Sequence, residues 1–557
     1  MKKFLLVLLL LCTFSLAACN NNNGPQTIKG SIYITGKRAL AVGKSTTLVA
    51  NKDVTWTSSD EAVATVTEDG LVTAVEFGDV TITATGVENT NEVAEHKISV
   101  YPYSDPALSG TVANLDDLKA TKTTVRFAIS FGSSIQTTIN ELVEKFEKAF
   151  PYIDVEVEVT SGYDQLKEAL VLSIQSGTAP TIAVGYPDHF AEYLVTQGLV
   201  ALDPYIKSTN PEIGMWDHTA NDWLTDFNFY QDYLVENQQF DVNETFYGLP
   251  FNKSTEVLIY NKEFFEEFEL EAPKTWQEAE VLSQRIYDIV KNKEADDLFD
   301  VKLSDFILGE NKDFIPFSWD STSNLFITAV RQWGGTYTEA LYERDGRTSL
   351  SAGLERYTEP VAENALKYLQ ELANKGLFNV PEAWELSYAS DAFKAGKCMI
   401  TVGSSAGLSY NSGGIGTLGV APIPYNAETG IKQVIQQGTN VCMFSQATDL
   451  ERLAGWLFIR FMLSPENNAY FASETGYFPV SASSEGHAIY QEFMEGNGSY
   501  QMAATVNKSY RSNGFTYFSD PAWAGSSAVR ENVGTAASAI LVAKKNVLEA
   551  LNEAISK

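Results

Sequence analysis

Cysteine, histidine and cationic side chains are scarce in this 557-residue sequence. Its four cysteines and four histidines show none of the paired spacings typical of zinc ligands, so we expect no metal site and no cofactor. Forty lysines and arginines stand against 71 aspartates and glutamates, for a net charge of −31. A surface this acidic repels nucleic acid, so nucleic acid is excluded as a partner.

The N-terminal apolar run, Phe4–Leu11, is too short to span a bilayer. It follows two lysines and precedes a small-residue box, which predicts an export signal over residues 1–18. Leu16-Ala-Ala-Cys19 resembles the bacterial lipoprotein signal, in which the cysteine is acylated; the alternative is an ordinary signal before a chance cysteine. The resemblance implies that Cys19 carries lipid, that residues 19–26 form a tether, and that the protein is anchored to the outer face of the bacterial cell membrane.

Short alternating runs separated by turn residues fill residues 27–101, which predicts a β-sandwich. The stretch Trp56-Thr-Ser-Ser-Asp-Glu-Ala-Val-Ala-Thr-Val resembles the group 2 bacterial immunoglobulin-like (Ig-like) family. We interpret this domain as a spacer; a surface adhesin is the alternative. A linker over residues 102–122 follows, with two prolines and a glycine.

From residue 123 onward, strands alternate with helices, a pattern typical of a mostly parallel, covered sheet. Helices are predicted at 133–150, 163–175, 275–291, 360–375, 389–395, 449–463, 465–475 and 527–556. Residues 123–557 are too many for one core, so we expect two lobes. Cys398 and Cys442 lie in apolar strands and are interpreted as buried thiols, with a disulfide left open.

Residues 123–557 resemble the extracellular solute-binding proteins of bacterial ABC importers, the group of maltose- and glycerol-3-phosphate-binding proteins. The resemblance runs through Phe146-Glu-Lys-Ala-Phe-Pro-Tyr, Gly177-Thr-Ala-Pro-Thr-Ile, Tyr247-Gly-Leu-Pro-Phe-Asn-Lys-Ser-Thr-Glu and Thr475-Gly-Tyr-Phe-Pro-Val. It implies an Ig-like sandwich followed by a bilobal α/β periplasmic-binding-protein fold of class II. The chain would cross between lobes near 252–257, near 437–441 and after Tyr477.

The same resemblance implies a monomer that captures a small-molecule carbohydrate and delivers it to the transmembrane subunits of an ABC permease. The ligand-binding candidates are polar or aromatic residues where strands meet loops: Tyr163, Asp188, Ser254, Trp319, Asp320, Ser404, Ser405, Gly438, Tyr477 and Trp523. Each has a structural alternative, with Trp319 as a core residue, Ser404 and Ser405 as a helix cap, and Tyr477 as a packed corner.

One departure bears on the ligand. The phosphate-binding branch of the family places an arginine before the last helix, where this sequence aligns Trp523, with Arg530 in the helix that follows. Loss of a guanidinium removes bidentate phosphate recognition, whereas an indole offers an apolar face to a sugar ring. We therefore expect a sugar or oligosaccharide, with glycerol 3-phosphate or a glycerophosphodiester as the alternative. Without a serine elbow, phosphate loop or metal motif, we expect no enzyme, and a glycan-active enzyme is the weaker alternative.

Overall fold

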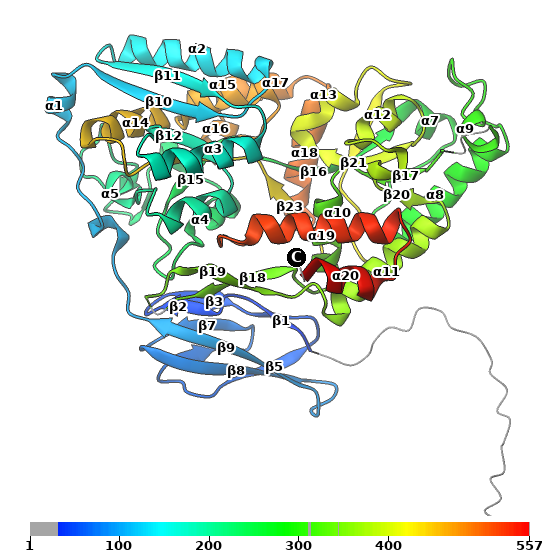
Figure 1. Ribbon diagram of the computed structural model, residues 1–557, viewed down its shortest axis with the longest axis horizontal. Helices are drawn as coiled ribbons and strands as arrows, with labels where there is room; N and C mark the ends of the chain where they lie inside the picture. Colours follow the sequence, from blue (N-terminus) through cyan, green and yellow to red (C-terminus); the bar gives the residue numbers. More distant parts are fainter. Residues whose placement is uncertain (1–31, 310–312, 344, 556–557) are drawn as a thin grey trace, which may run out of the picture.

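The computed structural model describes residues 32–309, 313–343 and 345–555. It consists of an N-terminal β-sandwich and a body of two α/β lobes, with the sandwich packed beneath the body in Figure 1. This arrangement confirms the predicted fold class. The predicted export signal and Cys19 lie outside the described residues.

The sandwich is built from two main sheets and a short strand pair, β1–β4. In strand β8, Val80, Ile82 and Ala84 are buried because alternate residues of a strand face the same side. The four-stranded sheet has the order β2 (Ala39–Ala41), β9 (Val93–Tyr101), β8 (Gly78–Gly86), β5 (Val54–Ser58). The remaining strands are β3 (Ser45–Thr47), β7 (Leu71–Ala74), β6 (Ala64–Val66), β1 (Ile34–Thr35) and β4 (Val49–Ala50).

The first lobe surrounds a five-stranded sheet with helices on both sides (Figure 1). Helix α2 (Ser133–Ala149) buries Ile139, Leu142, Val143 and Phe146, which recur at helical spacing and face the sheet. The strand order is β11 (Ile153–Val159), β10 (Thr123–Ile129), β12 (Ile182–Gly185), β24 (Asn440–Met443), β15 (Gly248–Pro250). Its other long helices are α3 (Tyr163–Ser176), α4 (Pro187–Val195), α14 (Asp449–Met462) and α15 (Pro465–Thr475).

The second lobe has its own sheet and core. The strand order is β20 (Phe378–Asn379), β17 (Phe317–Trp319), β21 (Ile400–Ser404), β16 (Ser254–Asn261), β23 (Gln433–Gln437), β25 (Thr516–Phe518), and β22 (Leu418–Ala421) also pairs with β16. The helices used below are α8 (Trp276–Lys291), α10 (Thr322–Gln332), α11 (Pro360–Asn374), α12 (Ala389–Lys394), α13 (Leu408–Asn411), α18 (Ser499–Ser512), α19 (Ser526–Leu541) and α20 (Val547–Ile555).

The lobes are joined at the predicted crossings. The chain leaves the first sheet after β15 and enters the second at β16, and it returns between β23 and β24. A third segment runs alongside, where the Phe478 N–H donates to the Lys253 carbonyl at 2.7 Å. Lys253 is fully buried at this hinge, where its ammonium pairs with Glu236 and burial lowers its pKa. A buried charge of this kind persists only with a partner.

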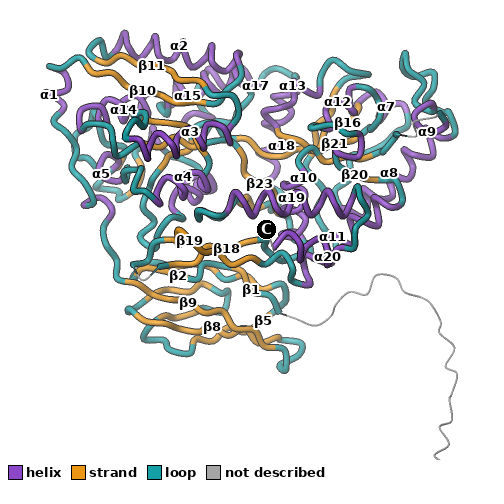
Figure 2. Tube along the Cα trace, viewed as in Figure 1, coloured by secondary structure: helices purple, strands orange, loops and turns teal. Residues whose placement is uncertain are grey.

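The Ig-like domain does not project away from the body. The hairpin of β18 (Thr338–Tyr342) and β19 (Thr348–Glu355) leaves the second lobe and lies between the sandwich and helices α4 and α19 (Figures 1 and 2). Arg38 of the sandwich pairs with Glu339 of this hairpin at 2.8 Å, and Lys37 and Lys44 pair with Glu244 of the first lobe. The domain therefore contacts both lobes.

The C-terminal region differs from the prediction of one helix over residues 527–556. The structure has two helices, α19 and α20, because the chain turns at Lys544, where φ is 56°. The Asn546 side chain then accepts from the Glu549 N–H and caps α20. Cys398 and Cys442 are buried free thiols. No helix in the described ranges is long and apolar enough for a membrane span.

Candidate functional site: a cleft between the lobes

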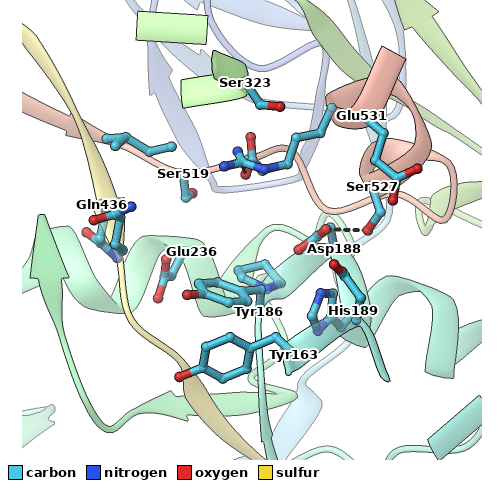
Figure 3. A pocket seen from close by; sticks show the side chains of 16 residues that line it. Tyr163, Tyr186, Asp188, His189, Glu236, Ser323, Gln436, Ser519, Ser527 and Glu531 are labelled. Carbon is cyan, nitrogen blue, oxygen red and sulfur yellow. Dashed lines mark hydrogen bonds and ion pairs between the residues drawn. The ribbon is translucent and has the colours of Figure 1, made fainter. Parts of the chain in front are cut away.

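Two cavities lie between the lobes and share the ring of Tyr163. The first has a volume of about 320 Å³ and the second about 640 Å³. Figure 3 shows the first, whose polar walls come from both lobes. Its side chains include Tyr163, Tyr186, Asp188, Glu236, Ser323, Gln436, Gln437, Ser519, Asp520, Ser527, Arg530 and Glu531.

Two tyrosines form the aromatic wall of the first cavity. Tyr163 begins α3, and Tyr186 precedes Pro187 at the start of α4, a position where proline favours both the extended residue before it and the helix after it. Their rings meet edge to face with centroids 5.3 Å apart. Burial raises the pKa of the Tyr163 hydroxyl well above its usual value, so it remains a neutral donor and acceptor.

Asp188 links the lobes directly. Its carboxylate, on α4, accepts a hydrogen bond of 2.5 Å from the Ser527 hydroxyl on α19, drawn as a dashed line in Figure 3. Burial by itself raises the pKa of Asp188, but His189, the Ser527 hydroxyl and Arg530 together lower it. The group is therefore an anionic acceptor in the cavity. The hydrogen bond belongs to the arrangement in which the two lobes are in contact.

Arg530 brings a guanidinium into the cavity, contrary to the inference from the Trp523 alignment. It is the only lysine or arginine that lines this cavity in the described part of the chain. Its Nη1 donates to the Asp520 carboxylate at 2.7 Å, and its Nη2 donates to the Asn324 side-chain oxygen. The positive charge is thus already neutralised by a carboxylate that lines the same cavity.

The second cavity contains four of the predicted residues: Tyr163, Asp320, Ser404 and Tyr477. Asp320 also accepts from the Ala389 N–H at 2.6 Å and so fixes the start of α12. Two exposed rings complete this wall from the second lobe, Tyr388 with 64% and Tyr410 with 69% of its surface exposed. The aromatic surface of the second lobe is therefore supplied by tyrosines on α13 and just before α12.

The structure corrects the placement of both predicted tryptophans. Trp319 is fully buried, stacked on Trp276 with centroids 5.7 Å apart, and its Nε1–H donates to Glu256 at 3.1 Å. Trp523 is 6% exposed, belongs to the same core and packs against the backbone of Gly353. Neither indole lines either cavity. A side chain without free surface offers no platform to a sugar.

Three more predicted residues lie at the hinge but not on the cavity walls. Ser254 is buried in its pairing with Gln437, and the Ser405 hydroxyl accepts from the Thr255 N–H at 3.2 Å. Gly438 adopts a φ of 86°, and a Cβ there would lie 1.7 Å from the Asn252 carbonyl oxygen. Only glycine permits this approach of the crossing strands. In this conformation their role is to form the hinge.

Several residues of the cavity walls were not among those predicted from the sequence, although for some of them the sequence contains a recognisable pattern. Ser527, Arg530 and Glu531 share one face of α19, because residues three and four apart lie side by side on a helix. Gln436 and Gln437 stand at the crossing where only Gly438 was selected. Tyr388 precedes α12 and Tyr410 lies on the short helix α13, and neither belongs to a local pattern, so only the tertiary structure places them in the cleft.

Comparison with known sequences then identifies the family. The profile of the bacterial extracellular solute-binding proteins matches residues 141–494, more than half of the chain. The chain belongs to this family. A second profile, that of the group 2 bacterial Ig-like domain, matches residues 34–97.

Three individual proteins similar to this chain are 17% to 24% identical to it. The sn-glycerol-3-phosphate-binding periplasmic protein UgpB of Escherichia coli K12 is 24% identical over 406 residues, which cover 71% of this chain and 82% of that protein. A Listeria monocytogenes ABC substrate-binding protein in complex with cycloalternan superposes with a TM-score of 0.59 at 17% identity, over 78% of this chain and 97% of that one. UgpB of Mycobacterium tuberculosis, in complex with glycerophosphocholine, has a TM-score of 0.57 at 18% identity over 78% and 96%. These structures share the bilobal fold.

Proposed function

We propose that this solute-binding protein captures a neutral carbohydrate, a sugar or oligosaccharide, between its lobes and delivers it to the permease of an ABC importer. The observation that carries the choice of ligand is the charge of the cleft. In the first cavity, Asp164, Asp188, Asp520 and Glu531 stand against one guanidinium, and a fifth carboxylate, Glu236, is paired with Lys253 behind the wall. Carboxylates accept hydrogen bonds from sugar hydroxyls but repel a phosphate.

The cations near the cleft are already paired, which supports the same choice. Arg530 is bound to Asp520, and Lys394 of the second cavity pairs with Asp391 at 2.8 Å. A phosphodiester on the remaining N–H groups of Arg530 would lie beside the Asp520 carboxylate and be repelled by it. It would avoid this repulsion only by displacing that carboxylate, which would be left partly desolvated and unpaired. A neutral sugar needs no such exchange.

The aromatic rings favour a ligand with apolar faces. Sugar rings present C–H surfaces that pack on aromatic rings, and hydroxyls that require polar partners. Tyr163 and Tyr186 line the first cavity, and Tyr388, Tyr410 and Tyr477 line the second. Because the two cavities share Tyr163, a ligand longer than one ring could contact both. This geometry supports an oligosaccharide.

A glycerophosphodiester is the second candidate. The presence of Arg530 in the cavity favours it, because a guanidinium matches phosphate oxygens in geometry. One relative is named for glycerol 3-phosphate, a monoester that is an alternative ligand of the same kind, and one neighbour is bound to the diester glycerophosphocholine. The Listeria neighbour is bound to a saccharide, cycloalternan.

The rest of the proposal concerns location and assembly. The protein acts as a monomer on the outer face of the cell membrane, where acylated Cys19 holds it near the permease. It binds its ligand without chemical change. The Ig-like domain serves as a spacer that is packed against the body rather than free of it.

The experiment is a binding panel on the purified mature chain. Maltotriose, cycloalternan, sn-glycerol 3-phosphate and glycerophosphocholine are titrated by calorimetry, and the thermal midpoint is recorded at each concentration. A ligand that binds only the folded state at 100 times its Kd stabilises it by about 2.7 kcal/mol. We expect stabilisation by a neutral saccharide and no released product. Tight glycerophosphocholine binding with no saccharide response would replace the proposal by its alternative, and steady product release would contradict a pure binding role.

A further inference from the structure

A chain of hydrogen bonds runs from the core of the second lobe to the cleft. Arg530, on the cavity wall, donates through Nη2 to the side-chain oxygen of Asn324 on α10. The other end of the Asn324 amide, Nδ2, donates to Glu256 Oε1 at 2.7 Å. Glu256 lies on β16, two residues after Ser254 at the hinge crossing, and has 1% of its surface exposed.

The donors and acceptors in this series of hydrogen bonds permit only one orientation of the Asn324 side-chain amide. An ionised carboxylate only accepts hydrogen bonds, so Glu256 requires the nitrogen end of Asn324. The oxygen end must then face Arg530, which only donates. Glu256 Oε1 is itself held by the indole N–H of Trp319 at 3.1 Å. Among the described residues Oε2 has no partner, so a proton added to the carboxyl can occupy Oε2 and leave Oε1 an acceptor.

We propose that Glu256, acting through Asn324, fixes the guanidinium of Arg530 in the cleft and so helps to set the pattern of ligand oxygens that the cleft accepts. The part that concerns the ligand rests on the proposed function. Glu256 and Asn324 are positioning residues, since both are buried behind the cavity wall. Trp319 also has a part in this series of hydrogen bonds, because its indole N–H holds the Glu256 carboxylate that orients the Asn324 amide.

The geometry explains why the guanidinium needs such a support. Asp520 holds Nη1 on one side at 2.7 Å, but one contact leaves a guanidinium free to rotate about it. The second contact, to Asn324, fixes the plane. Of the five N–H groups of an arginine, two are used in these contacts and the rest remain for ligand or water. Their directions are therefore set by a residue that no ligand reaches.

The first test follows the guanidinium without any ligand. Arginine-selective 15N labelling of the full mature chain reports rotation and hydrogen exchange of each guanidinium, and the Arg530 signal is assigned by its loss in Arg530→Lys. In Glu256→Gln the amide oxygen still faces the N–H groups of Asn324 and Trp319, but without the negative charge it accepts more weakly and holds Asn324 less firmly. We expect faster rotation and exchange at Arg530 in this variant. Glu382→Gln is the matched control, because Glu382 is bonded to Thr322 and not to this chain.

Rescue separates positioning from general stability. In Glu256→Gln/Asn324→Asp the new carboxylate accepts from Arg530 without help, so slow exchange at Arg530 should return even if the thermal midpoint does not. Unchanged Arg530 exchange in Glu256→Gln, or failure of the double variant to restore it, would overturn the positioning role. This readout is independent of which solute binds.

The second test measures affinity for maltotriose and glycerophosphocholine. For whichever probe the parent protein binds, Glu256→Gln should raise Kd about fivefold, the effect of one ordinary hydrogen bond, and the double variant should restore it. An unchanged Kd together with altered Arg530 exchange would refute the effect on the ligand while keeping the positioning role. If neither probe binds the parent, the proposed function fails and the exchange measurement still decides the positioning role.

Discussion

Replacement of Trp319 by alanine tests whether this residue belongs to the core or to the ligand. The structure predicts a large loss of stability, with no more than the roughly fivefold effect on ligand affinity that follows from loss of the hydrogen bond to Glu256. The indole is fully buried, stacks on Trp276 at an interplanar angle of 15°, and donates to Glu256. Alanine removes the ring from a packed interior and leaves a cavity beside a buried carboxyl.

The magnitude follows from these contacts. Truncation of a buried tryptophan to alanine costs about 3–5 kcal/mol, a large share of the ~5–15 kcal/mol that stabilises a typical protein. With a urea m-value of about 3 kcal/mol per M, the unfolding midpoint should fall by about 1–1.7 M. Trp319→Phe keeps the stacking on Trp276 but loses the donor to Glu256, so its loss should be smaller.

The assay pairs urea denaturation, followed by circular dichroism, with calorimetric affinity for the ligand found in the binding panel. Tyr410→Ala is the matched variant on the cleft surface. Its ring is 69% exposed, so stability should change by no more than about 0.5 kcal/mol while affinity falls. A normal urea midpoint for Trp319→Ala with strongly reduced affinity would refute the core assignment and return Trp319 to the cleft.

Three further outcomes are expected. Burial raises the pKa of Glu256 from 4.5 to about 7. The contribution of this group to stability is therefore complete below pH 4.5 and is lost as pH rises through about 7. Urea denaturation at a series of pH values should show up to about 3 kcal/mol of this dependence in the parent protein and none of it in Glu256→Gln. Ser527→Ala removes the hydrogen bond to Asp188 between the lobes, and we expect a Kd about two- to tenfold higher with an unchanged thermal midpoint; an unchanged Kd would mean that this contact is absent from the bound state. Cys19→Ser should move the protein from the membrane fraction to the soluble exported fraction, and retention in the membrane fraction would disprove acylation at this residue.

Local pattern was sufficient for much of the architecture. The helical spacing of Ile139, Leu142 and Phe146 predicted α2 to within one residue of its end, because an apolar stripe on a helix must face a core. The crossings at Lys253 and Gly438 were likewise predicted, since the family resemblance covers those stretches. The C-terminal region was predicted wrongly as one helix, because the turn at Lys544 has no glycine or proline to announce it.

Which side chains line the cleft could not be predicted from the sequence pattern, because the pattern does not show which side of each element faces the cleft. Phe317 and Trp319, two residues apart on β17, face the same side and both stack on Trp276, whereas the neighbouring Asp320 lines the cleft. Strand periodicity shows that the two rings share a side, but only the packing on Trp276 shows that this side is the core. The sequence by itself determined the order of domains, the strand-to-loop junctions and the acidic character of the surface. The tertiary structure alone decided which side chains meet there, because Arg530, Asp520 and Asn324 come from separate segments and become neighbours only when α19 packs against α10.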